Sequence, residues 1–429
     1  MNIHPRHARR VALAVHKVAK FRGGGSALPG LVAERLDPGF LKRALEGLPR
    51  GVIVISGTNG KTTTTKMVAQ LLRANGLKVF TNPTGSNFTR GIASSLLSHI
   101  DEDGQLDADI AVLELDEAHA VQFISHVETR YSLILNVLRD QLDRFGEIDH
   151  TARLLEKVVA ATTEGVVLNR EDPLVASLKS ATAKSVHVQY FGHSPNLARL
   201  FPSDKDLHGK STKSAETPSV HRGDVILEKL SGSKATFAFG QNSLSPATLK
   251  LDGAYNVLNA AAALAMVRMV LGGNANPDEL LSELASVRPA FGRGEAVNID
   301  GQPLEIVLVK NPSGFRLALH SYAKRRAATM IAINDNYADG RDMSWLWDVD
   351  FTSLSADGVS MVSGIRAYDM ALRLQYDQVD VSHVEPHISS ALRHFFETTT
   401  GPRRVYCTYT AMLALRRELG KQHHLEPIE

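Results

Sequence analysis

Several features that define other classes of protein are scarce in this chain. Its 429 residues include a single cysteine, Cys407, which excludes an internal disulfide and a cysteine-rich metal site. Cys407 lies in an apolar run, so we expect a buried and unreactive thiol. The net charge of +2 is too small to favour nucleic-acid binding. No run of 18 apolar residues is present, which argues against a membrane span. Together these absences favour an enzyme of the reducing cytoplasm.

The first fifty residues differ in charge from the rest of the chain. They hold ten Lys and Arg against three Asp and Glu, and residues 5–20 predict a basic amphipathic helix. No signal peptide is expected, because the apolar stretch 11–15 is short and is followed by His16 and Lys17. We expect residues 1–50 to pack on the next domain. Contact with an anionic membrane surface, at its inner face, is the alternative. Leu28-Pro-Gly30 predicts a turn.

From residue 51 onward, apolar strands alternate with helical patterns. Strands are predicted at 52–56, 78–81, 110–115, 132–136 and 165–169, with helices such as 62–75 and 150–161 between them. Apolar strands without polar interruptions predict a parallel sheet covered on both faces, so the fold class is α/β.

The pattern divides the chain into two α/β domains. Residues 51–295 predict a central nucleotide-binding domain, with a cysteine-free insertion at about 185–240. Within it, the polar stretch 193–222 predicts a loop or a partly disordered insertion. Two helices are predicted near the end of this domain, at 252–271 and 278–286. Residues 296–429 predict a smaller C-terminal α/β domain, which has a usual domain size.

The strongest functional signal is the segment from Val52 to Thr65. An apolar run stops at a glycine turn and a helical pattern begins at once, which is the layout of a phosphate-binding loop. Lys61 would reach the outer phosphates of ATP, and the Thr62 hydroxyl would hold Mg²⁺. Two residues separate the loop glycines here, where the generic motif has four. The predicted nucleotide-binding residues of the loop are Gly57, Thr58, Asn59, Gly60, Lys61, Thr62 and Thr63.

Acidic side chains follow the strand predicted at 110–115. Glu114 lies at its carboxyl end, and Asp116 and Glu117 come next. Ligands of open parallel sheets bind at that edge, so a carboxylate facing the phosphate loop is placed to hold a metal ion beside ATP. We predict Thr62 and Glu114 as Mg²⁺ ligands, with a catalytic role for Glu114. Asp116 and Glu117 are both near enough to share this role, and the sequence does not separate them.

Other polar segments give weaker signals. Polar groups suited to an anion or a substrate lie in three segments: the turn-rich loop 81–87, the segment 136–144 after a later strand, and the residues that precede a helix at 313. The predicted substrate contacts are Thr84, Ser86, Asn87, Arg139, Asp140 and Lys310.

Two further positions are predicted to contact the nucleotide. Asn256 and Asn259 lie three apart on the alanine-rich helix, where a base or ribose contact is a hypothesis for Asn256. Their local pattern alone favours ordinary hydrogen-bonded helix asparagines. Arg293 lies near the domain junction, where an arginine reaches across to the phosphates when domains close.

The densest polar segment is Asn334–Phe351, which holds five aspartates and both tryptophans of the chain. Acids and aromatics that follow a strand rarely serve packing alone, although a tryptophan pair is more often found in a core or an interface than in catalysis.

These motifs resemble a known family. The loop Gly57-Thr-Asn-Gly-Lys-Thr-Thr63, Glu114 and the asparagine helix are similar to those of the Mur ligase superfamily. The motifs at 84–91, 139–146, 310–314 and 334–351 resemble the MurT family, the synthetase subunits of lipid II isoglutaminyl synthase, and the similarity spans nearly the whole chain. The phosphate loop begins near residue 57, which leaves no room for the N-terminal domain that binds the UDP-precursor in standard Mur ligases.

The resemblance implies a reaction that uses ATP and Mg²⁺. ATP phosphorylates the α-carboxylate of D-glutamate in the lipid II stem peptide, and ammonia then displaces phosphate to leave D-isoglutamine. It also implies a heterodimer with a GatD-type glutaminase that supplies the ammonia. A C-terminal aspartate completes the partner's Cys–His set, and Asp348 is favoured here over Asp350. A reactive cysteine for glutamine hydrolysis must then come from the partner, because Cys407 is a poor candidate.

Two family features are not carried over to this chain. MurT proteins commonly have a four-cysteine zinc ribbon in the middle domain, whereas residues 185–240 have no cysteine, so we predict no zinc. Lys157 lies near the position of the carbamylated lysine of standard Mur ligases, but no role is assigned to it.

Two other functions are weighed against this one. A folylpolyglutamate synthase-like ligase would add glutamate instead of ammonia, and the 334–351 segment argues against it. A non-enzymatic nucleotide-sensing module is opposed by the combination of Lys61, Thr62 and Glu114, together with a second domain.

Overall fold

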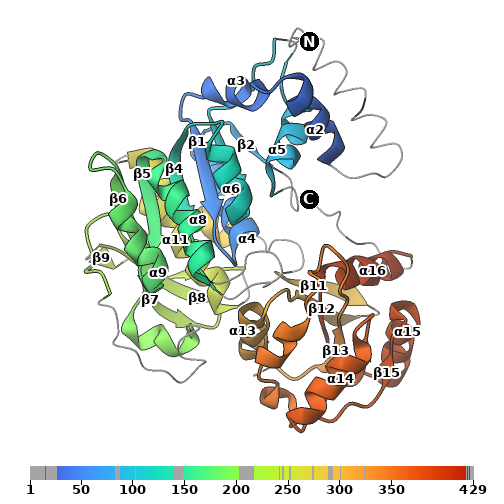
Figure 1. Cartoon of the computed structure of the whole chain (residues 1–429). Helices are drawn as coiled ribbons and strands as arrows, with labels where there is room; N and C mark the ends of the chain where they lie inside the picture. Colours follow the sequence, from blue (N-terminus) through green and yellow to red (C-terminus); the bar gives the residue numbers. More distant parts are fainter. Residues whose placement is uncertain are drawn as a thin grey trace. The chain divides into compact units, whose positions relative to one another are not determined.

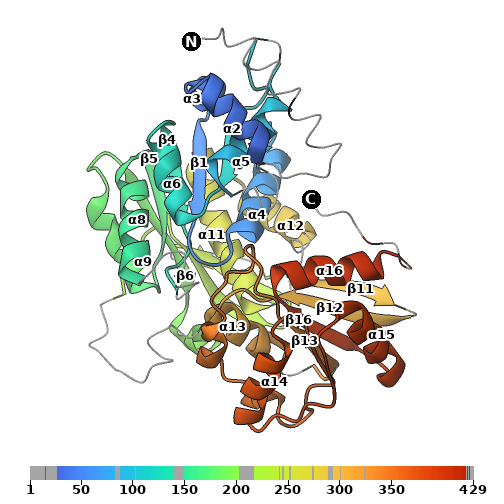
Figure 2. The same cartoon turned by 45° about the vertical axis from the view of Figure 1, so that its right-hand side comes forward.

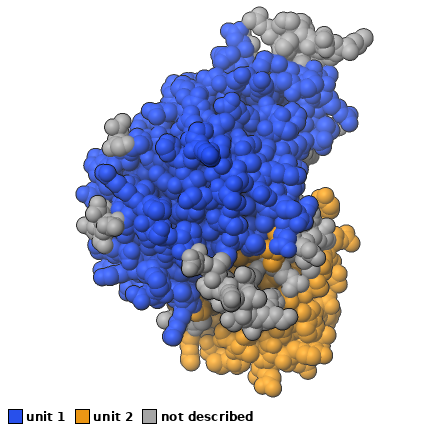
Figure 3. Space-filling view, turned by 60° about the vertical axis from the view of Figure 1, so that its left-hand side comes forward, with its two compact units in different colours: residues 1–137, 149–250, 256–287 blue, residues 138–148, 251–255, 288–429 orange. Residues whose placement is uncertain are grey.

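The computed structural model describes residues 15, 27–82, 87–101, 103–138, 148–201, 217–240, 242–243, 246–250, 253–272, 275–287, 293–299, 301–322, 325–421, 423 and 425. The chain forms two compact units (Figure 3). The first contains residues 1–137, 149–250 and 256–287, and the second contains residues 138–148, 251–255 and 288–429. Each unit is built around its own sheet, which confirms the predicted α/β class.

The first unit has a ten-stranded sheet in the order β10-β8-β7-β6-β5-β4-β1-β3-β2, with β9 paired to β8. The seven strands from β2 to β7 in this order pair in parallel, and β8, β9 and β10 pair antiparallel. The strands are β1 (Val52–Ser56), β2 (Val79–Thr81), β3 (Ile110–Glu114), β4 (Thr129–Ile134), β5 (Thr162–Asn169), β6 (His187–His193), β7 (Val225–Ser231), β8 (Lys234–Phe239), β9 (Asn242–Ser243) and β10 (Ala247–Thr248).

Helices cover both faces of this sheet. In Figure 1, α6, α8 and α9 lie in front of it and α11 lies behind it. Every residue of β1 and β3 is buried, which explains why these strands lack polar alternation. The helices are α2 (Ala27–Leu36), α3 (Phe40–Glu46), α4 (Lys61–Ala74), α5 (Thr89–Leu97), α6 (Glu117–Ile124), α8 (Ile148–Ala160), α9 (Pro173–Ser177), α11 (Ala254–Leu271) and α12 (Pro277–Ser286), with 3₁₀ turns η1 (Leu178–Ala181) and η2 (Pro195–Leu200).

Helix α11 belongs to the core. Within the described part of the chain it is the one helix long and apolar enough to cross a membrane, but 67% of it is buried inside the protein. Residues 260–267 of this helix, most of them alanines, are all buried, since small side chains let a helix lie close against a sheet.

Two predictions for the first unit were wrong. Leu28-Pro-Gly30 is not a turn but the first turn of α2, where Pro29 costs no hydrogen bond because the first N–H groups of a helix have no partner within it. The 193–222 stretch is not wholly a loop, because His193 ends β6 and residues 195–200 form η2. Strands β6, β7 and β8 thus extend the sheet through the region expected as an insertion, and residues 202–216 lie outside the described residues.

The second unit has a six-stranded sheet in the order β11-β12-β16-β13-β14-β15. All neighbours pair in parallel except β11 and β12. The strands are β11 (Arg293–Ile299), β12 (Gln302–Leu308), β13 (Ala328–Ala332), β14 (Met361–Ser363), β15 (Val384–Glu385) and β16 (Arg403–Cys407). The helices are α13 (Pro312–Tyr322), α14 (Ala367–Tyr376), α15 (Ile388–Thr398) and α16 (Tyr409–Leu419), with 3₁₀ turns η4 (Ser344–Asp348) and η5 (Thr352–Leu354).

Alternate strand residues of the second unit point into two separate cores. Ile331, Val362 and Tyr406 pack with α13, α14 and the two 3₁₀ turns. Their neighbours Met330, Met361 and Cys407 pack with α15 and α16 on the opposite face (Figure 2). Cys407 is fully buried in the second core, which confirms the predicted inaccessible thiol.

Candidate active site

The predicted phosphate loop connects β1 to α4 at the carboxyl edge of the first sheet. Gly57 and Gly60 have φ angles of +128° and +92°, which side chains other than glycine rarely adopt. A Cβ on Gly57 would lie 2.9 Å from the backbone N of Asn136, and one on Gly60 would lie 2.7 Å from Nδ2 of Asn259. The two glycines therefore let the loop lie close against Asn136 and Asn259.

Asn136, two residues past the end of β4, holds the middle of this loop. The N–H of Asn59 donates to Oδ1 of Asn136 at 2.8 Å, and Nδ2 of Asn136 donates to the carbonyl of Asn59 at 2.9 Å. The N–H of Thr58 also donates to the carbonyl of Asn136 at 3.0 Å. This reciprocal pairing fixes the loop to the adjacent strand of the sheet and so preorganises it.

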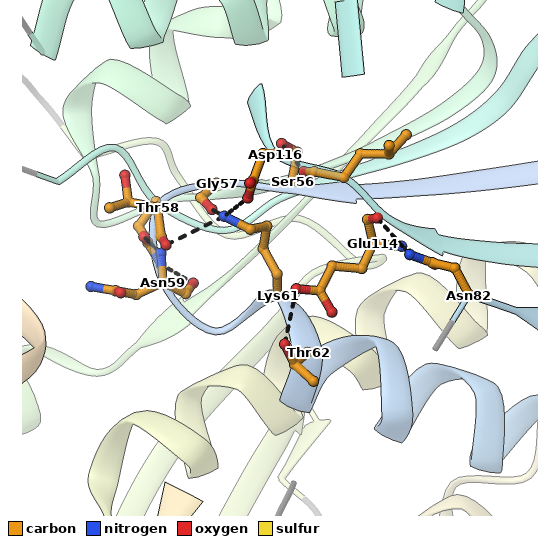
Figure 4. A network of polar contacts seen from close by, with 11 residues as sticks. Ser56, Gly57, Thr58, Asn59, Lys61, Thr62, Asn82, Glu114 and Asp116 are labelled. Carbon is orange, nitrogen blue, oxygen red and sulfur yellow. Dashed lines mark hydrogen bonds and ion pairs between the residues drawn. The ribbon is translucent and has the colours of Figure 1, made fainter. Parts of the chain in front are cut away.

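Lys61 is the first residue of α4, and its side chain is almost fully buried. Its ammonium donates to the carbonyl of Gly57 at 2.6 Å and lies 3.0 Å from Oδ1 of Asp116, as Figure 4 shows. The acid that follows β3 therefore pairs with the loop lysine, which distinguishes Asp116 from Glu117 in a way that the sequence did not.

The two predicted Mg²⁺ ligands lie together. The Thr62 hydroxyl donates to Oε1 of Glu114 at 2.9 Å (Figure 4). The backbone of Glu114 is in turn fixed by Asn82, which follows β2: its Oδ1 accepts from the Glu114 N–H at 2.9 Å, and its Nδ2 donates to the Glu114 carbonyl at 3.0 Å. Asn82 was missed by sequence reasoning, although its position just past a strand end was the available signal.

The loop residues fit a nucleotide triphosphate with Mg²⁺. The Thr63 hydroxyl, in the first turn of α4, is buried without a hydrogen-bond partner, as expected of a group that binds a phosphate oxygen. The start of α4 also presents backbone N–H groups, which favour anions. A threonine hydroxyl beside a carboxylate is a donor set of the hard oxygen type that Mg²⁺ prefers.

The asparagine helix contacts the loop through a residue that sequence reasoning did not choose. Asn259 is buried on α11 and lies against Gly60, whereas Asn256 is partly exposed one turn earlier. The prediction of a nucleotide contact for Asn256 stays a prediction.

Several predicted residues lie outside the described part of the chain. These are Thr84, Ser86, Arg139 and Asp140, together with the side chain of Arg293, whose backbone begins β11. Asn87 is described, and its carbonyl accepts from the Asp116 N–H at 3.0 Å, so this loop reaches the acid that pairs with Lys61.

Lys310 belongs to the second unit, between β12 and α13. The next residue, Asn311, is fully buried and caps α13, because its Oδ1 accepts from the N–H of Gly314 at 2.7 Å.

The segment Asn334–Phe351 lies at the carboxyl edge of the second sheet. Asp339 is buried and accepts hydrogen bonds from the N–H and hydroxyl of Thr410 at the start of α16. Burial raises the pKa of the Asp339 carboxyl, and its hydrogen bonds with Thr410 oppose that shift. The role of Asp339 is thus to anchor the segment, a contact across 71 residues that the sequence pattern did not indicate.

The two aspartates predicted to serve a partner differ in environment. Oδ1 of Asp350 accepts from the N–H of Thr352 at 2.8 Å and from its hydroxyl at 2.6 Å, and these bonds lower the pKa of the Asp350 carboxyl. The Asp350 carboxylate therefore makes local hydrogen bonds to Thr352, the first residue of η5. Asp348 is partly exposed at the end of η4, and its backbone carbonyl accepts from Arg316 of α13. Asp350 is the more exposed of the two, so the choice of Asp348 over Asp350 stays a prediction.

Metal ligands of the zinc type do not gather in the described residues, where no group of three His, Cys, Asp or Glu side chains is arranged to hold an ion. His193 is buried and stacks on Phe201, with ring centroids 4.7 Å apart. Lys157 is exposed on the last turn of α8.

Family models match both units. Residues 55–267 match the Mur ligase middle domain, and residues 308–412 match the MurT ligase C-terminal domain. The second match includes the whole Asn334–Phe351 segment together with α14 and β16.

Relatives similar over most of the chain carry the same name. "Lipid II isoglutaminyl synthase (glutamine-hydrolyzing) subunit MurT" of Staphylococcus aureus (strain COL) is 29% identical over 87% of this chain and 86% of the relative. The protein of that name from Streptococcus pneumoniae (strain ATCC BAA-255 / R6) is 27% identical over 95% of both chains. Among solved structures, MurF ligase from Thermotoga maritima in complex with ADP superposes with a TM-score of 0.63 and 16% identity, covering 90% of this chain and 84% of the other, which shows a shared fold.

Proposed function

The chain belongs to the MurT family of ATP-dependent Mur-type ligases, and from that premise we propose that it amidates the α-carboxylate of D-glutamate in the stem peptide of lipid II. The product would be D-isoglutamine. The relatives are named as one subunit of a glutamine-hydrolysing enzyme, so the proposal includes a second subunit, a GatD-type glutaminase, as the source of ammonia.

The proposed reaction has two steps that balance without a redox partner. A carboxylate oxygen of D-glutamate attacks the terminal phosphorus of ATP, ADP leaves, and an acyl phosphate forms. Ammonia then attacks the acyl carbon, inorganic phosphate leaves, and the attacking nitrogen loses a proton. Both steps separate or move negative charge, so catalysis depends on positioning and electrostatic stabilisation.

The described residues supply that stabilisation at the phosphate loop. Thr62 and Glu114 would hold Mg²⁺, which neutralises charge on the phosphates when it is bound. Lys61, now paired with Asp116, would present its ammonium to the outer phosphates, and the backbone N–H groups of the loop would bind the inner ones. Asn82 and Asn136 would keep these groups in place.

One observation carries the proposal. A loop lysine and an Mg²⁺-type donor pair lie on one phosphate loop, in a chain whose C-terminal unit matches the MurT family. The only thiol of the chain is buried in a strand, so the nucleophile that releases ammonia from glutamine would come from another polypeptide.

The test is mass spectrometry of lipid II incubated with the chain, ATP and Mg²⁺. Three nitrogen sources are compared: ammonium, glutamine, and glutamine with the candidate glutaminase. We expect the mass change that replaces OH by NH₂ with ammonium and with the partner, but not with glutamine alone. Unchanged lipid II in every arm would overturn the proposal. Incorporation of glutamate into another carboxylate would instead indicate a folylpolyglutamate synthase-like ligase.

A further inference from the structure

The sequence before α2 is rich in positive charge and has no negative charge. No Asp or Glu precedes Glu34, whereas six Lys and Arg side chains fall within residues 5–22. These are Arg6, Arg9, Arg10, Lys17, Lys20 and Arg22. A basic excess of this size on a short segment with helical spacing indicates an extended anionic surface as its partner, more than a single acidic group.

The cations share one side of the helix predicted at 5–20. At about 100° per residue, the five cations of this helix fall within an arc of about 100°. The opposite side is apolar and consists of Ala8, Val11, Ala12, Val15, Val18 and Ala19, while Leu13 alone falls among the cations. Val15, the described residue of this segment, is helical. A basic face opposite an apolar face is the pattern of a helix that lies in a membrane interface.

Helix α2 continues this pattern in the described part of the chain. Its inner side, formed by residues 29, 30 and 33, is buried. A helix buried on one side normally carries polar side chains on the other. The outward side of α2 instead carries Leu28, Leu31 and Val32 beside the exposed Arg35. Leu28 is 54% exposed, and it is the one large hydrophobic side chain exposed in the described part of the first unit.

Helix α2 is fixed close to the phosphate loop. Gly30 lies against the backbone carbonyl of Arg90 in α5, so closely that a Cβ on Gly30 would overlap it (Figures 1 and 2). Three residues before Arg90, the carbonyl of Asn87 accepts from the N–H of Asp116, the acid that pairs with Lys61. Since three residues span at most about 11 Å, α2 lies within about 20 Å of that pair. A surface that α2 contacts is therefore close to the site of phosphate chemistry.

We propose that residues 5–22 and the outward side of α2 bind an anionic lipid bilayer and hold the phosphate loop near it. A bilayer of this kind offers negative headgroups to the six cations and an apolar interior to the valines and Leu28, so one partner matches both faces. The purpose of the contact rests on the proposed function, in which the acceptor carboxylate belongs to a lipid. Binding to the bilayer would confine the enzyme to the surface where that lipid resides.

The test measures flotation of the full-length chain with vesicles of phosphatidylcholine, with and without 40% phosphatidylglycerol. We expect binding to the anionic vesicles only, weakened by added salt. The charge variant Arg9→Gln/Arg10→Gln/Lys17→Gln should bind about a hundredfold more weakly, because each cation near an anionic surface strengthens binding about fivefold. Its matched control, Lys229→Gln/Lys234→Gln/Arg326→Gln, removes three exposed cations elsewhere and should bind like wild type.

A second pair of variants tests the apolar contact. Leu28→Gln should bind the anionic vesicles about fivefold more weakly, because roughly half of a leucine side chain would lose its apolar surroundings. The matched control is Leu372→Gln, which changes a side chain of similar exposure (48%) on α14 of the second unit and should bind like wild type. Circular dichroism of each variant checks that its fold is retained.

The outcomes separate this inference from the proposed function. If the charge variant amidates lipid II more slowly in anionic vesicles but at the wild-type rate in detergent micelles, with ammonium in both arms, the result supports both. Equal binding of wild type to neutral and anionic vesicles, or equal weakening by the charge variant and its control, would overturn the membrane contact. Binding of a DNA duplex in place of vesicles would assign the basic segment to nucleic acid and also overturn it. Vesicle binding is measured without lipid II or ATP, so a wild-type chain that binds vesicles but does not amidate lipid II contradicts the proposed function alone.

Discussion

The buried pair formed by Lys61 and Asp116 allows the structural role of the lysine to be separated from its role in catalysis. The two side chains are 5% and 10% exposed, with 3.0 Å between Nζ and Oδ1. Replacing Lys61 by methionine keeps its length but leaves Asp116 as a buried charge without this partner. Breaking such a pair from one side costs about 3 kcal/mol or more, whereas removing both charges is often nearly neutral.

We therefore expect Lys61→Met to lower the unfolding midpoint of the first unit by about 6 °C or more. The double variant Lys61→Met/Asp116→Asn should recover most of that loss. Thermal unfolding followed by circular dichroism measures this, and the transition of the first unit is identified in wild type as the one that an ATP analogue raises.

Amidation should behave differently from stability. With ammonium as nitrogen source, both the single and the double variant should lose activity by about a thousandfold, because neither presents a cation to the phosphates. Recovery of activity in the double variant would refute a direct role for Lys61 at the phosphates. A single variant as stable as wild type would refute the estimate for the pair.

Three further predictions follow from the described contacts. Asp348→Asn should abolish glutamine-driven amidation and spare ammonium-driven amidation, and equal loss of both rates would refute the split roles. Asp350→Asn retains an oxygen that accepts from the N–H of Thr352, so it should leave both rates within a few fold of wild type. Gly60→Ala should destabilise the first unit by more than Gly76→Ala, for which about 1 kcal/mol is expected, because both glycines have positive φ but only a Cβ on Gly60 meets another side chain. Equal unfolding midpoints for the two variants would contradict this. Burial raises the pKa of Tyr406 from 10.0 to about 12. The neutral side chain therefore contributes fully to the free energy of unfolding below pH 10, and this contribution is lost as pH rises through about 12. Denaturation measured from about pH 9 to 12 should show this fall in the free energy of unfolding in wild type and not in Tyr406→Phe.

Local patterns were sufficient to predict much of the fold. β1 was predicted with the bounds that the structure has, because four apolar residues and Ser56 form an extended run that ends at a glycine. The helix predicted at 252–271 is α11, whose start lies within two residues of the predicted one, since its helical pattern is a local signal. Pro29 misled the prediction because proline marks both turns and the first turn of a helix.

Contacts between distant segments could not be predicted in the same way. The motif identified Lys61 and Thr62, but the choice of Asp116 as the partner of Lys61 depends on β3 lying beside β1 in the sheet. Asn82 and Asn136 support the loop for the same reason, since each follows a strand whose place is set by sheet order. The exposure of Tyr368, Leu372 and Tyr376 on α14 was not predicted, because apolar side chains on a helix normally indicate its buried face.

The distribution of tryptophan makes the chain its own optical reporter. Both tryptophans lie in η4 of the second unit, Trp345 buried at 4% exposure and Trp347 half exposed. Intrinsic tryptophan fluorescence therefore follows the second unit alone, while circular dichroism follows both. When the two signals are recorded in one denaturation experiment, a difference between their midpoints measures how independently the nucleotide-binding unit and the C-terminal unit unfold.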